Sequence, residues 1–300
     1  MSGTFEVRHL SPDGRPYTDT NGRRVTPQGC LEQFPKPRDI PKLVIVPGLN
    51  LDPHAQPPES FEDAAEWLRM VADAGALITS TCSGAWLLAH AGLLNGLEAT
   101  THWNYAETLT RLYPKVRLRR ERVLAPAGAG HSVVTAGGAS CWGDLMLYLI
   151  ARFAGAHEAR RIAKEFLLQP HSDGQLCYAS LVATSQHDDQ LIAEAQVWAA
   201  QHYDTPSPVA TMAERSGMTQ RGFHRRFRKA TGQAPVDYIQ TLRVEEAKQL
   251  LETTAAPIDE IASEVGYSEP SSFRSAFRKR VGISASAYRK KWRALAPMDT

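Results

Sequence analysis

The C-terminal third of the chain carries an internal repeat, which limits what this part of the protein can fold into. Residues 212–232 and 261–282 share an Ala, a Gly, a hydroxyl residue, two Phe and a final Gly at corresponding places. The shared Gly suits a tight turn between two helices, because Gly adopts left-handed backbone at little cost. Each copy therefore predicts a helix-turn-helix. The matched pairs are Ala213/Ala262, Gly217/Gly266, Thr219/Ser268, Phe223/Phe273, Phe227/Phe277 and Gly232/Gly282.

The second helix of each copy combines an apolar seam with basic side chains. Its two Phe are four residues apart and therefore share one face of the helix. The other positions include Arg and Lys but no acidic residue, over 219–230 in the first copy and 270–281 in the second. We expect Thr219 and Ser268 to cap these helices. Such a helix suits the major groove of double-stranded DNA.

Two sets of side chains are expected to contact DNA in different ways. Those flanking the Phe seam on the exposed side are candidates for base edges, and the others for phosphates, which add affinity without sequence information. A solvated surface charge is the alternative for any single Arg. The base-edge candidates are Gln220, Arg221, His224, Arg225, Arg228, Ser271, Arg274, Ser275 and Arg278. The phosphate candidates are Arg226, Lys229, Lys279, Arg280, Lys290 and Lys291.

Residues 235–254 separate the two copies and carry an apolar stripe of helical period. A helix of this length, at ~1.5 Å per residue, could hold the two motifs at a fixed separation. Two motifs on one rigid helix could enter successive major grooves, ~34 Å apart, on one face of the duplex.

Residues 41–168 alternate strand-like and helix-like segments. Residues 42–48, 76–81 and 131–138 read as strands, and 60–75, 84–94 and 144–155 as helices, with Ser60 as an N-cap and Gly75 as a stop. This alternation predicts an α/β fold with a mostly parallel sheet flanked by helices. We expect residues 1–168 to form an α/β effector and dimerisation domain. Residues 169–188 would be a linker, and 189–295 an all-α DNA-binding domain with two helix-turn-helix motifs.

The stretch "LITSTCSGAWLLAHAGLL" (77–94) places Cys82 at a sharp turn from strand to helix. A helix N-terminus lowers the pKa of a thiol, so the geometry is that of a nucleophile elbow. Catalysis would also need a base, and His102 is the only plausible partner. The sequence leaves three roles open for Cys82: a nucleophile, a thiol that contacts a ligand, or a small structural residue. The expected ligand pocket consists of Cys82, Trp86, His102 and Trp103, with Trp142 as a further neighbour.

Two parts of the chain resemble known families. "IASEVGYSEPSSFRSAFRKRVGISASAYRK" (261–290) resembles the AraC-type regulators, although Ala285 stands where these usually have Pro. "TCSGAWLLAHAGLLNGLEATTHW" (81–103), "VPG" (46–48) and "TAGG" (135–138) resemble the PfpI-like, class I glutamine amidotransferase-like domain. Together they resemble the GlxA-like transcription regulators, whose α/β domain is flavodoxin-like. The resemblance implies a regulator controlled by a small nitrogenous effector, such as an amino acid or a quaternary amine that aromatic rings could hold.

Three departures from hydrolytic PfpI-like proteins argue against catalysis. Ser83 follows Cys82 where those proteins have His, and Leu49 replaces the second Gly of a typical "PGG". The first residues resemble the family's second strand, so we expect the sheet to lack the first strand–helix unit and its supporting acid. We therefore predict no catalytic residue. The alternative is a Cys82-dependent amidase or hydrolase with an attached DNA-binding domain.

The distribution of charge and the spacing of the cysteines indicate which partners and sites to expect. Residues 201–300 hold 16 Lys and Arg against 11 Asp and Glu, whereas residues 1–200 hold 18 against 21, which suggests partners of two kinds. The four cysteines form no C-x-x-C pair, so we predict neither a metal site nor a disulfide framework, and no cofactor. With no apolar export signal or membrane span, we expect a cytoplasmic protein that forms a homodimer and has no membrane partner.

Overall fold

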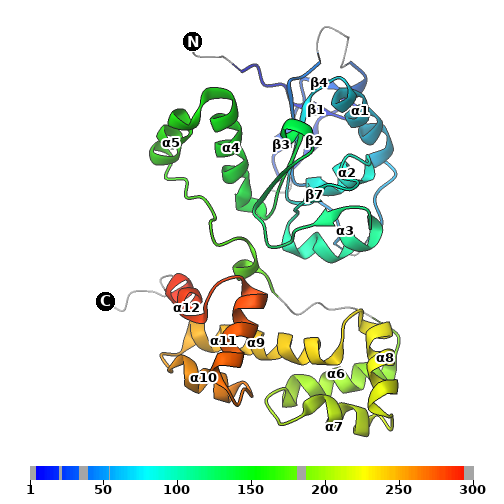
Figure 1. The fold of residues 1–300 in the computed structure, drawn as a ribbon. Helices are drawn as coiled ribbons and strands as arrows, with labels where there is room; N and C mark the ends of the chain where they lie inside the picture. Colours follow the sequence, from blue (N-terminus) through cyan, green and yellow to red (C-terminus); the bar gives the residue numbers. More distant parts are fainter. Residues whose placement is uncertain (1–4, 20–21, 34–39, 54, 181–186, 294–300) are drawn as a thin grey trace. The chain divides into compact units, whose positions relative to one another are not determined.

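The computed structural model describes residues 5–19, 22–33, 40–53, 55–180 and 187–293 (Figure 1). The chain divides into two compact units, Met1–Gln175 and Leu176–Thr300. The division falls within the linker expected at 169–188, of which residues 181–186 lie outside the described residues. No helix of the described ranges has both the length and the hydropathy to cross a membrane.

The first unit is built on a four-stranded sheet with the order β5-β6-β10-β9. Strands β5 (Leu43–Val46), β6 (Leu77–Thr81) and β10 (Val133–Ala136) run parallel, and β9 (Leu124–Ala127) pairs antiparallel with β10. The register places Leu43 opposite Leu77, and Val133 opposite Ile78. The mostly parallel sheet predicted from the sequence is thereby confirmed. Among the described residues β5 is one edge, paired with β6 alone.

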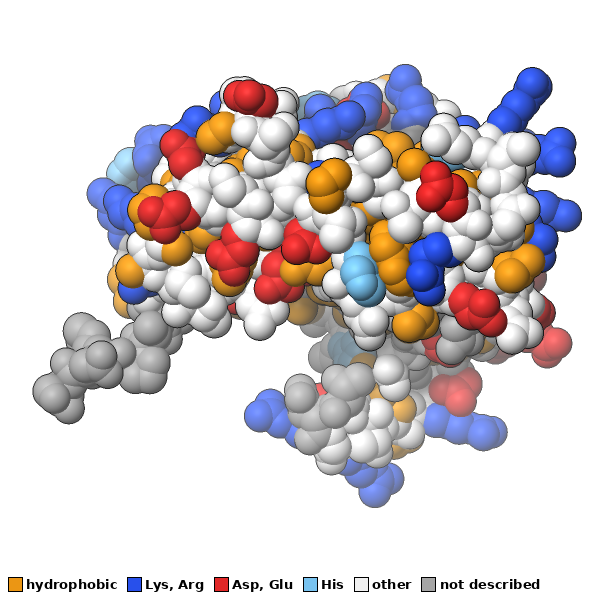
Figure 2. All heavy atoms as spheres, turned by 90° about the horizontal axis from the view of Figure 1, so that it is seen from below, with side chains coloured by type: hydrophobic (Ala, Val, Ile, Leu, Met, Phe, Trp, Pro, Cys, Tyr) orange, Lys and Arg blue, Asp and Glu red, His pale blue; other side chains and the backbone are white. Residues whose placement is uncertain are grey.

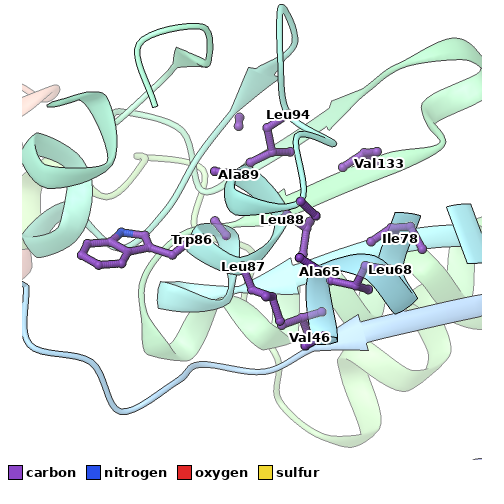
Figure 3. Close-up of a cluster of buried hydrophobic side chains, with 14 of the residues drawn as sticks. Val46, Ala65, Leu68, Ile78, Trp86, Leu87, Leu88, Ala89, Leu94 and Val133 are labelled. Carbon is purple, nitrogen blue, oxygen red and sulfur yellow. The ribbon is translucent and has the colours of Figure 1, made fainter. Parts of the chain in front are cut away.

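Helices cover both faces of this sheet, because its central strands are apolar on both sides. Helices α1 (Phe61–Asp73) and α2 (Ala85–His90) pack on one face with Ile78 and Val133, and α4 (Trp142–Ala154) packs on the other with Leu77 and Val134. Figure 3 shows the first of these cores, where Ala65 and Leu68 of α1 lie close to Leu88 of α2. The alternation along β6 and β10 thus divides their side chains between two apolar cores.

The remaining elements of the first unit are short or peripheral. The strands are β1 (Leu10–Ser11), β2 (Tyr17–Thr18), β3 (Arg24–Val25), β4 (Gly29–Cys30), β7 (Glu98–Ala99) and β8 (Arg117–Leu118), which pair as β1-β4, β2-β3 and β7-β8. The helices are α3 (Ala106–Leu112) and α5 (Ala156–Glu165), the latter packed on α4 (Figure 1). The 3₁₀ turns are η1 (Leu31–Gln33), η2 (Cys82–Gly84), η3 (Trp103–Tyr105), η4 (Ala129–His131) and η5 (Ala139–Cys141).

The ends of α1 test the predicted helix signals. Gly75 follows the helix with a φ of 92°, a left-handed conformation that favours Gly, as the sequence predicted. Ser60 stands at the N-cap position, but its side chain makes no capping hydrogen bond. The predicted N-cap position is therefore confirmed without a side-chain cap bond, and the helix has Glu62 and Asp63 in its first turn.

The described residues of the second unit form helices joined by turns and loops, with no strand, as predicted. Its elements are η6 (Leu176–Tyr178), α6 (Gln190–His202), α7 (Pro208–Arg215), α8 (Gln220–Thr231), α9 (Pro235–Thr253), α10 (Ile258–Glu264), α11 (Pro270–Val281) and α12 (Ala285–Arg293). Helices α7 and α8 form the first predicted motif and α10 and α11 the second. Helix α9 contacts all four of them and α12 (Figure 1). Each motif has its own buried apolar cluster.

Candidate nucleic-acid interface and cysteine turn

The first motif presents α8 as a helix with one buried face. Phe223 and Phe227 are both 0% exposed, with their ring centroids 5.6 Å apart. The Thr219 side chain accepts a hydrogen bond from the Gly222 backbone N–H at 3.2 Å and so caps the helix, as predicted. Gly217, in the turn before it, has a φ of 64°. Helix α8 therefore has its start fixed by a cap, an apolar face buried in the unit, and a polar face on the other side.

The second motif repeats this arrangement with a different helix start. Phe273 and Phe277 of α11 are also 0% exposed, again with ring centroids 5.6 Å apart. Ser268 is not the N-cap, contrary to prediction. The helix begins at Pro270 with Glu269 at the N-cap position and no side-chain cap bond, because the extra residue of this copy moves the start past Ser268.

Helix α9 joins the motifs with 19 residues, or about 28 Å of helix. The Arg243 guanidinium is buried and donates to the Tyr203 carbonyl oxygen at 2.7 Å, which ties α9 to the end of α6. At the other motif, Arg280 donates to the Asp237 carboxylate at 3.2 Å. These contacts attach α6 and the second motif to α9.

The predicted DNA-contact residues lie mainly on the exposed faces of α8 and α11. Eight of the nine base-edge candidates are exposed, and His224 is half-buried. On α11 the exposed candidates follow the spacing of a single helical stripe; they are Ser271, Arg274, Ser275 and Arg278. Among the phosphate candidates, Arg280 and Lys291 are half-buried and Arg226, Lys229, Lys279 and Lys290 are exposed.

Three of these arginines form ion pairs within the unit. Arg226 donates to Asp189, the N-cap of α6, at 2.8 Å, and Arg274 pairs with Asp259 in the first turn of α10. Arg280 pairs with Asp237, as described above. The Arg226 guanidinium lowers the pKa of Asp189 below its usual value, chiefly through their hydrogen bond. These pairs hold three cationic heads in defined positions, and the sequence did not predict them.

Charged side chains are unevenly distributed in the view of Figure 2. Most Lys and Arg side chains lie along the left, upper and right-hand edges, whereas most Asp and Glu side chains in front lie between them. Helices α8 and α11 hold Arg and Lys but no acidic residue.

In the first unit, Cys82 occupies the strained turn between β6 and α2 that the sequence predicted. Its φ is 53°, and its backbone N–H donates to the Gly137 carbonyl oxygen at 2.9 Å. A Cβ at Gly84 would collide with the Pro47 carbonyl oxygen, so only Gly fits two residues after the thiol. The residues that follow β10 and β5, Gly137 and Pro47, therefore hold the turn in place.

Ser83 explains why the turn tolerates two departures from the hydrolytic pattern. Its hydroxyl donates to the Leu49 carbonyl oxygen at 2.7 Å and lies 2.8 Å from the Leu49 N–H, from which it accepts. Ser83 and Leu49 thus act together to hold the loop after β5 against the turn. This bond joins residues 34 positions apart and leaves no local signal in the sequence.

Cys82 and His102 are both shifted toward their neutral forms. Burial raises the pKa of the Cys82 thiol, so the neutral form prevails at neutral pH. Burial lowers the pKa of His102, and its Nδ1 accepts from the Asn104 backbone N–H at 3.1 Å. No hydrogen bond joins the two side chains in the described part of the chain.

The predicted ligand residues differ in how far a ligand can reach them. Cys82, His102 and Trp103 are half-buried, and the His102 and Trp103 rings lie 4.9 Å apart. Trp86 is 0% exposed, and Figure 3 shows its ring directed away from the other labelled core side chains. Trp142 is 53% exposed. Because it is fully buried, Trp86 presents no surface to a ligand. Trp142 lies at the protein surface.

Gln175 joins this site from a distant part of the sequence. Its Nε2 donates to the Thr101 carbonyl oxygen at 2.8 Å, while its buried Oε1 has no hydrogen-bond partner among the described residues. A Cβ at Gly138 would lie 3.6 Å from His102 Cδ2 and 3.9 Å from Gln175 Oε1, so Gly138 leaves space between the two side chains. An unsatisfied acceptor in this position suits a donor on a ligand.

An open pocket of about 340 Å³ lies in the second unit, away from Cys82. It is bounded by the start of α7, by α8 and by α9, and two base-edge candidates, Gln220 and His224, line it. This pocket borders the helix face that the sequence assigns to DNA, so it is not the effector site expected in the first unit.

Comparison with known proteins finds relatives for both units. Residues 2–150 match the DJ-1/PfpI family, and residues 212–291 match a helix-turn-helix domain. The HTH-type transcriptional regulator CdhR of Pseudomonas aeruginosa is 31% identical over 297 residues, which cover 97% of this chain and 83% of that protein. The HTH-type transcriptional regulator GlxA of Rhizobium meliloti is 25% identical over 293 residues, covering 96% and 86%.

Among solved structures, the DNA-binding domain of the transcriptional factor AdpA, in complex with a target DNA, is 41% identical. The match covers 36% of this chain and 96% of that one, with a TM-score of 0.34.

Proposed function

The chain belongs to the HTH-type transcriptional regulators that join a DJ-1/PfpI domain to an AraC-type helix-turn-helix domain, and from this premise we propose how it works. Helices α8 and α11 bind double-stranded DNA in a sequence-specific manner, and a small molecule held in the first unit controls that binding. Because transcription regulators act where the DNA is, we place the protein in the cytoplasm.

The observation that carries this proposal is the repeated reader helix. Two helices bury a Phe pair, expose a polar and basic stripe, and are attached to the same 19-residue rod. If the basic side chains were only a solvated surface, neither the repetition of the motif nor its attachment to α9 would be explained. The exposed stripes then read base edges, and the outer Arg and Lys neutralise phosphates.

A binding assay on the region upstream of the protein's own gene tests the DNA proposal. Arg225→Ala and Arg278→Ala each remove an exposed candidate, and we expect each to weaken specific binding by about 10- to 100-fold, the cost of losing a base contact of 1–3 kcal/mol. Lys229→Ala should weaken binding to all sequences alike and reduce the slope of affinity against salt by about one counterion.

Lys164→Ala provides the control, because Lys164 is an exposed cation on α5 of the first unit. It should leave DNA affinity unchanged. Affinity that is insensitive to salt, or equal losses for Lys164→Ala and Arg225→Ala, would rule out the assigned interface.

We propose the site around Cys82, His102, Trp103 and Gln175 as the effector site. A nitrogenous effector, such as an amino acid or a quaternary amine, would find aromatic faces at His102 and Trp103, and an amino group would find the free Gln175 Oε1. Thermal melting with a panel of such compounds tests this, since a specific ligand raises the melting temperature.

His102→Ala should abolish the ligand-induced shift, whereas His157→Ala, at an exposed position of α5, should not. A shift that survives His102→Ala and Gln175→Ala would place the effector elsewhere.

We propose that the cysteine turn supports ligand binding without catalysis. The neutral Cys82 thiol and the missing bond to His102 support this, and so do relatives that are named as regulators. Cys82→Ala should therefore leave promoter binding intact and remove no hydrolase activity.

We also propose that the protein is a homodimer joined through the first unit. Four large apolar side chains on or next to α4 and α5 are exposed, namely Trp142, Phe153, Phe166 and Leu167. Burying such side chains is a common driving force of association. Phe153→Ser together with Phe166→Ser should halve the mass measured by sedimentation, and Val197→Ser, equally exposed on α6, should not.

A further inference from the structure

Three side chains with metal-binding atoms meet at the start of α4, next to Gly138, where a Cβ would lie 3.8 Å from Cys141 Sγ and 3.6 Å from His102 Cδ2. They are Cys141, Asp144 and His171, and one ligand atom from each lies within 4.8 Å of the others. Cys141 and Asp144 are three residues apart and share a helical face. His171 comes from the segment after α5, 27 positions from Asp144.

The three groups are already held in position. The Asp144 carboxylate accepts from the His171 backbone N–H at 2.9 Å, and its second oxygen lies 2.7 Å from His171 Nδ1. Cys141 is 3% exposed, and the side chains of Asp144 and His171 are 11% and 22% exposed. The thiol is therefore shielded, while the imidazole leaves a path to solvent.

A structural role for the Asp144–His171 bond alone does not account for Cys141. A divalent cation would account for all three groups, since thiolate, carboxylate and imidazole are all its ligands and one atom of each lies within 4.8 Å of the others. On binding, the Asp144–His171 side-chain contact, or the contact of His171 Nε2 with Ser140 Oγ at 3.3 Å, would be exchanged for a bond to the ion.

We propose that Cys141, Asp144 and His171 form a binding site for a divalent transition metal of the zinc class. The mixed sulfur, nitrogen and oxygen donors select zinc over calcium or magnesium. Tetrahedral zinc needs ligand atoms about 3.2–3.8 Å apart. Atoms at the 4.8 Å limit must therefore approach by about 1.0–1.6 Å, whereas Asp144 Oδ2 and His171 Nδ1, 2.7 Å apart, must separate if both bind the ion. Three protein ligands leave one position for water or another donor.

The sequence predicted no metal site, because its cysteines form no close pair. The ligands come together only when the segment after α5 folds back onto the first turn of α4. The metal-site proposal is independent of the DNA-binding proposal. If the protein binds no metal, the DNA-binding proposal still stands.

Titration of the full-length protein, first stripped with a chelator, tests the site with Zn²⁺ and then Co²⁺ as probes. We expect one tightly bound equivalent of Zn²⁺ and, with Co²⁺, a sulfur-to-metal charge-transfer band. Cys141→Ser should remove that band, and His171→Ala and Asp144→Asn should weaken Zn²⁺ binding by about 100-fold or more.

Cys30→Ser is the matched control, because Cys30 is a half-buried free thiol in the same unit outside the cluster. It should bind both ions like the unmodified protein. Circular dichroism checks that each variant is folded, and the milder Asp144→Asn replaces any variant that is not. The proposal is overturned if the unmodified protein binds no stoichiometric Zn²⁺, or if all three cluster variants bind it as tightly as Cys30→Ser.

Discussion

Cys82 combines a strained backbone with a buried thiol. A non-Gly residue with a φ of 53° is strained by about 1–3 kcal/mol, and this one is held by the Gly137 carbonyl oxygen and by the close approach of Gly84 to Pro47. Hydrogen bonds with Ser83 favour the thiolate. Burial opposes it more strongly, so the pKa of the thiol is raised rather than lowered.

The direction of that shift predicts slow alkylation of Cys82. Its pKa lies above the ordinary value of 9.0, so its thiolate fraction at pH 7.5 is smaller than that of a free thiol. Reaction with iodoacetamide, followed by mass spectrometry of the Cys82 peptide, should be slower than that of a small-molecule thiol and should continue to rise above pH 9. Rapid labelling that levels off near neutral pH would instead reveal an activated nucleophile.

Replacing the hydroxyl residue before each recognition helix by Ala should affect stability differently in the two helix-turn-helix motifs. Thr219→Ala removes a hydrogen bond to the first turn of α8 and should lower the free energy of unfolding by about 1 kcal/mol. Ser268→Ala should change it by less than about 0.5 kcal/mol, because α11 begins after Ser268 and takes no cap from it. Urea unfolding of both variants measures the difference, and equal losses would contradict it.

The two turn glycines are also unequal, although both have positive φ. A Cβ at Gly217 would meet no atom within 4 Å, so Gly217→Ala should cost only the left-handed backbone, about 1–2 kcal/mol. A Cβ at Gly266 would lie 2.5 Å from the Asp204 carbonyl oxygen and 2.9 Å from Arg243 Nη2. Gly266→Ala should therefore be clearly more destabilising in the same urea assay, and the idea fails if the two variants match.

Repetition and periodicity made most of this architecture predictable from sequence. The Phe pairs, the turn glycines and the strand–helix alternation are local signals, and the corresponding elements form as predicted. Contacts between distant residues left no such signal. The ion pair of Arg226 with Asp189, the bonds of Ser83 to Leu49 and the approach of Gln175 to Thr101 all depend on how elements pack. The predicted cap of α11, Ser268, was wrong because the second copy has one extra residue, which moves the N-cap position to Glu269.

At the scale of the whole molecule, each unit holds a different candidate site. The first unit holds the cysteine turn, and the second holds α8 and α11, in the part of the chain (residues 201–300) where Lys and Arg outnumber Asp and Glu by 16 to 11. Their apolar cores are separate: two clusters centre on the sheet and two on the helix-turn-helix motifs. A chain with separate cores can lose one without losing the other.

Thermal unfolding should therefore show two transitions that single substitutions move one at a time. Phe273→Ala empties a fully buried site of the second unit, at a cost of about 3–5 kcal/mol, and should lower one melting temperature by roughly 10 °C. Leu88→Ala, at 0% exposure in the core of the first unit, should lower the other. Promoter DNA should raise only the transition that Phe273→Ala lowers, and an effector only the one that Leu88→Ala lowers. Differential scanning calorimetry resolves the transitions, and a single transition moved by both substitutions would mean that the units unfold together.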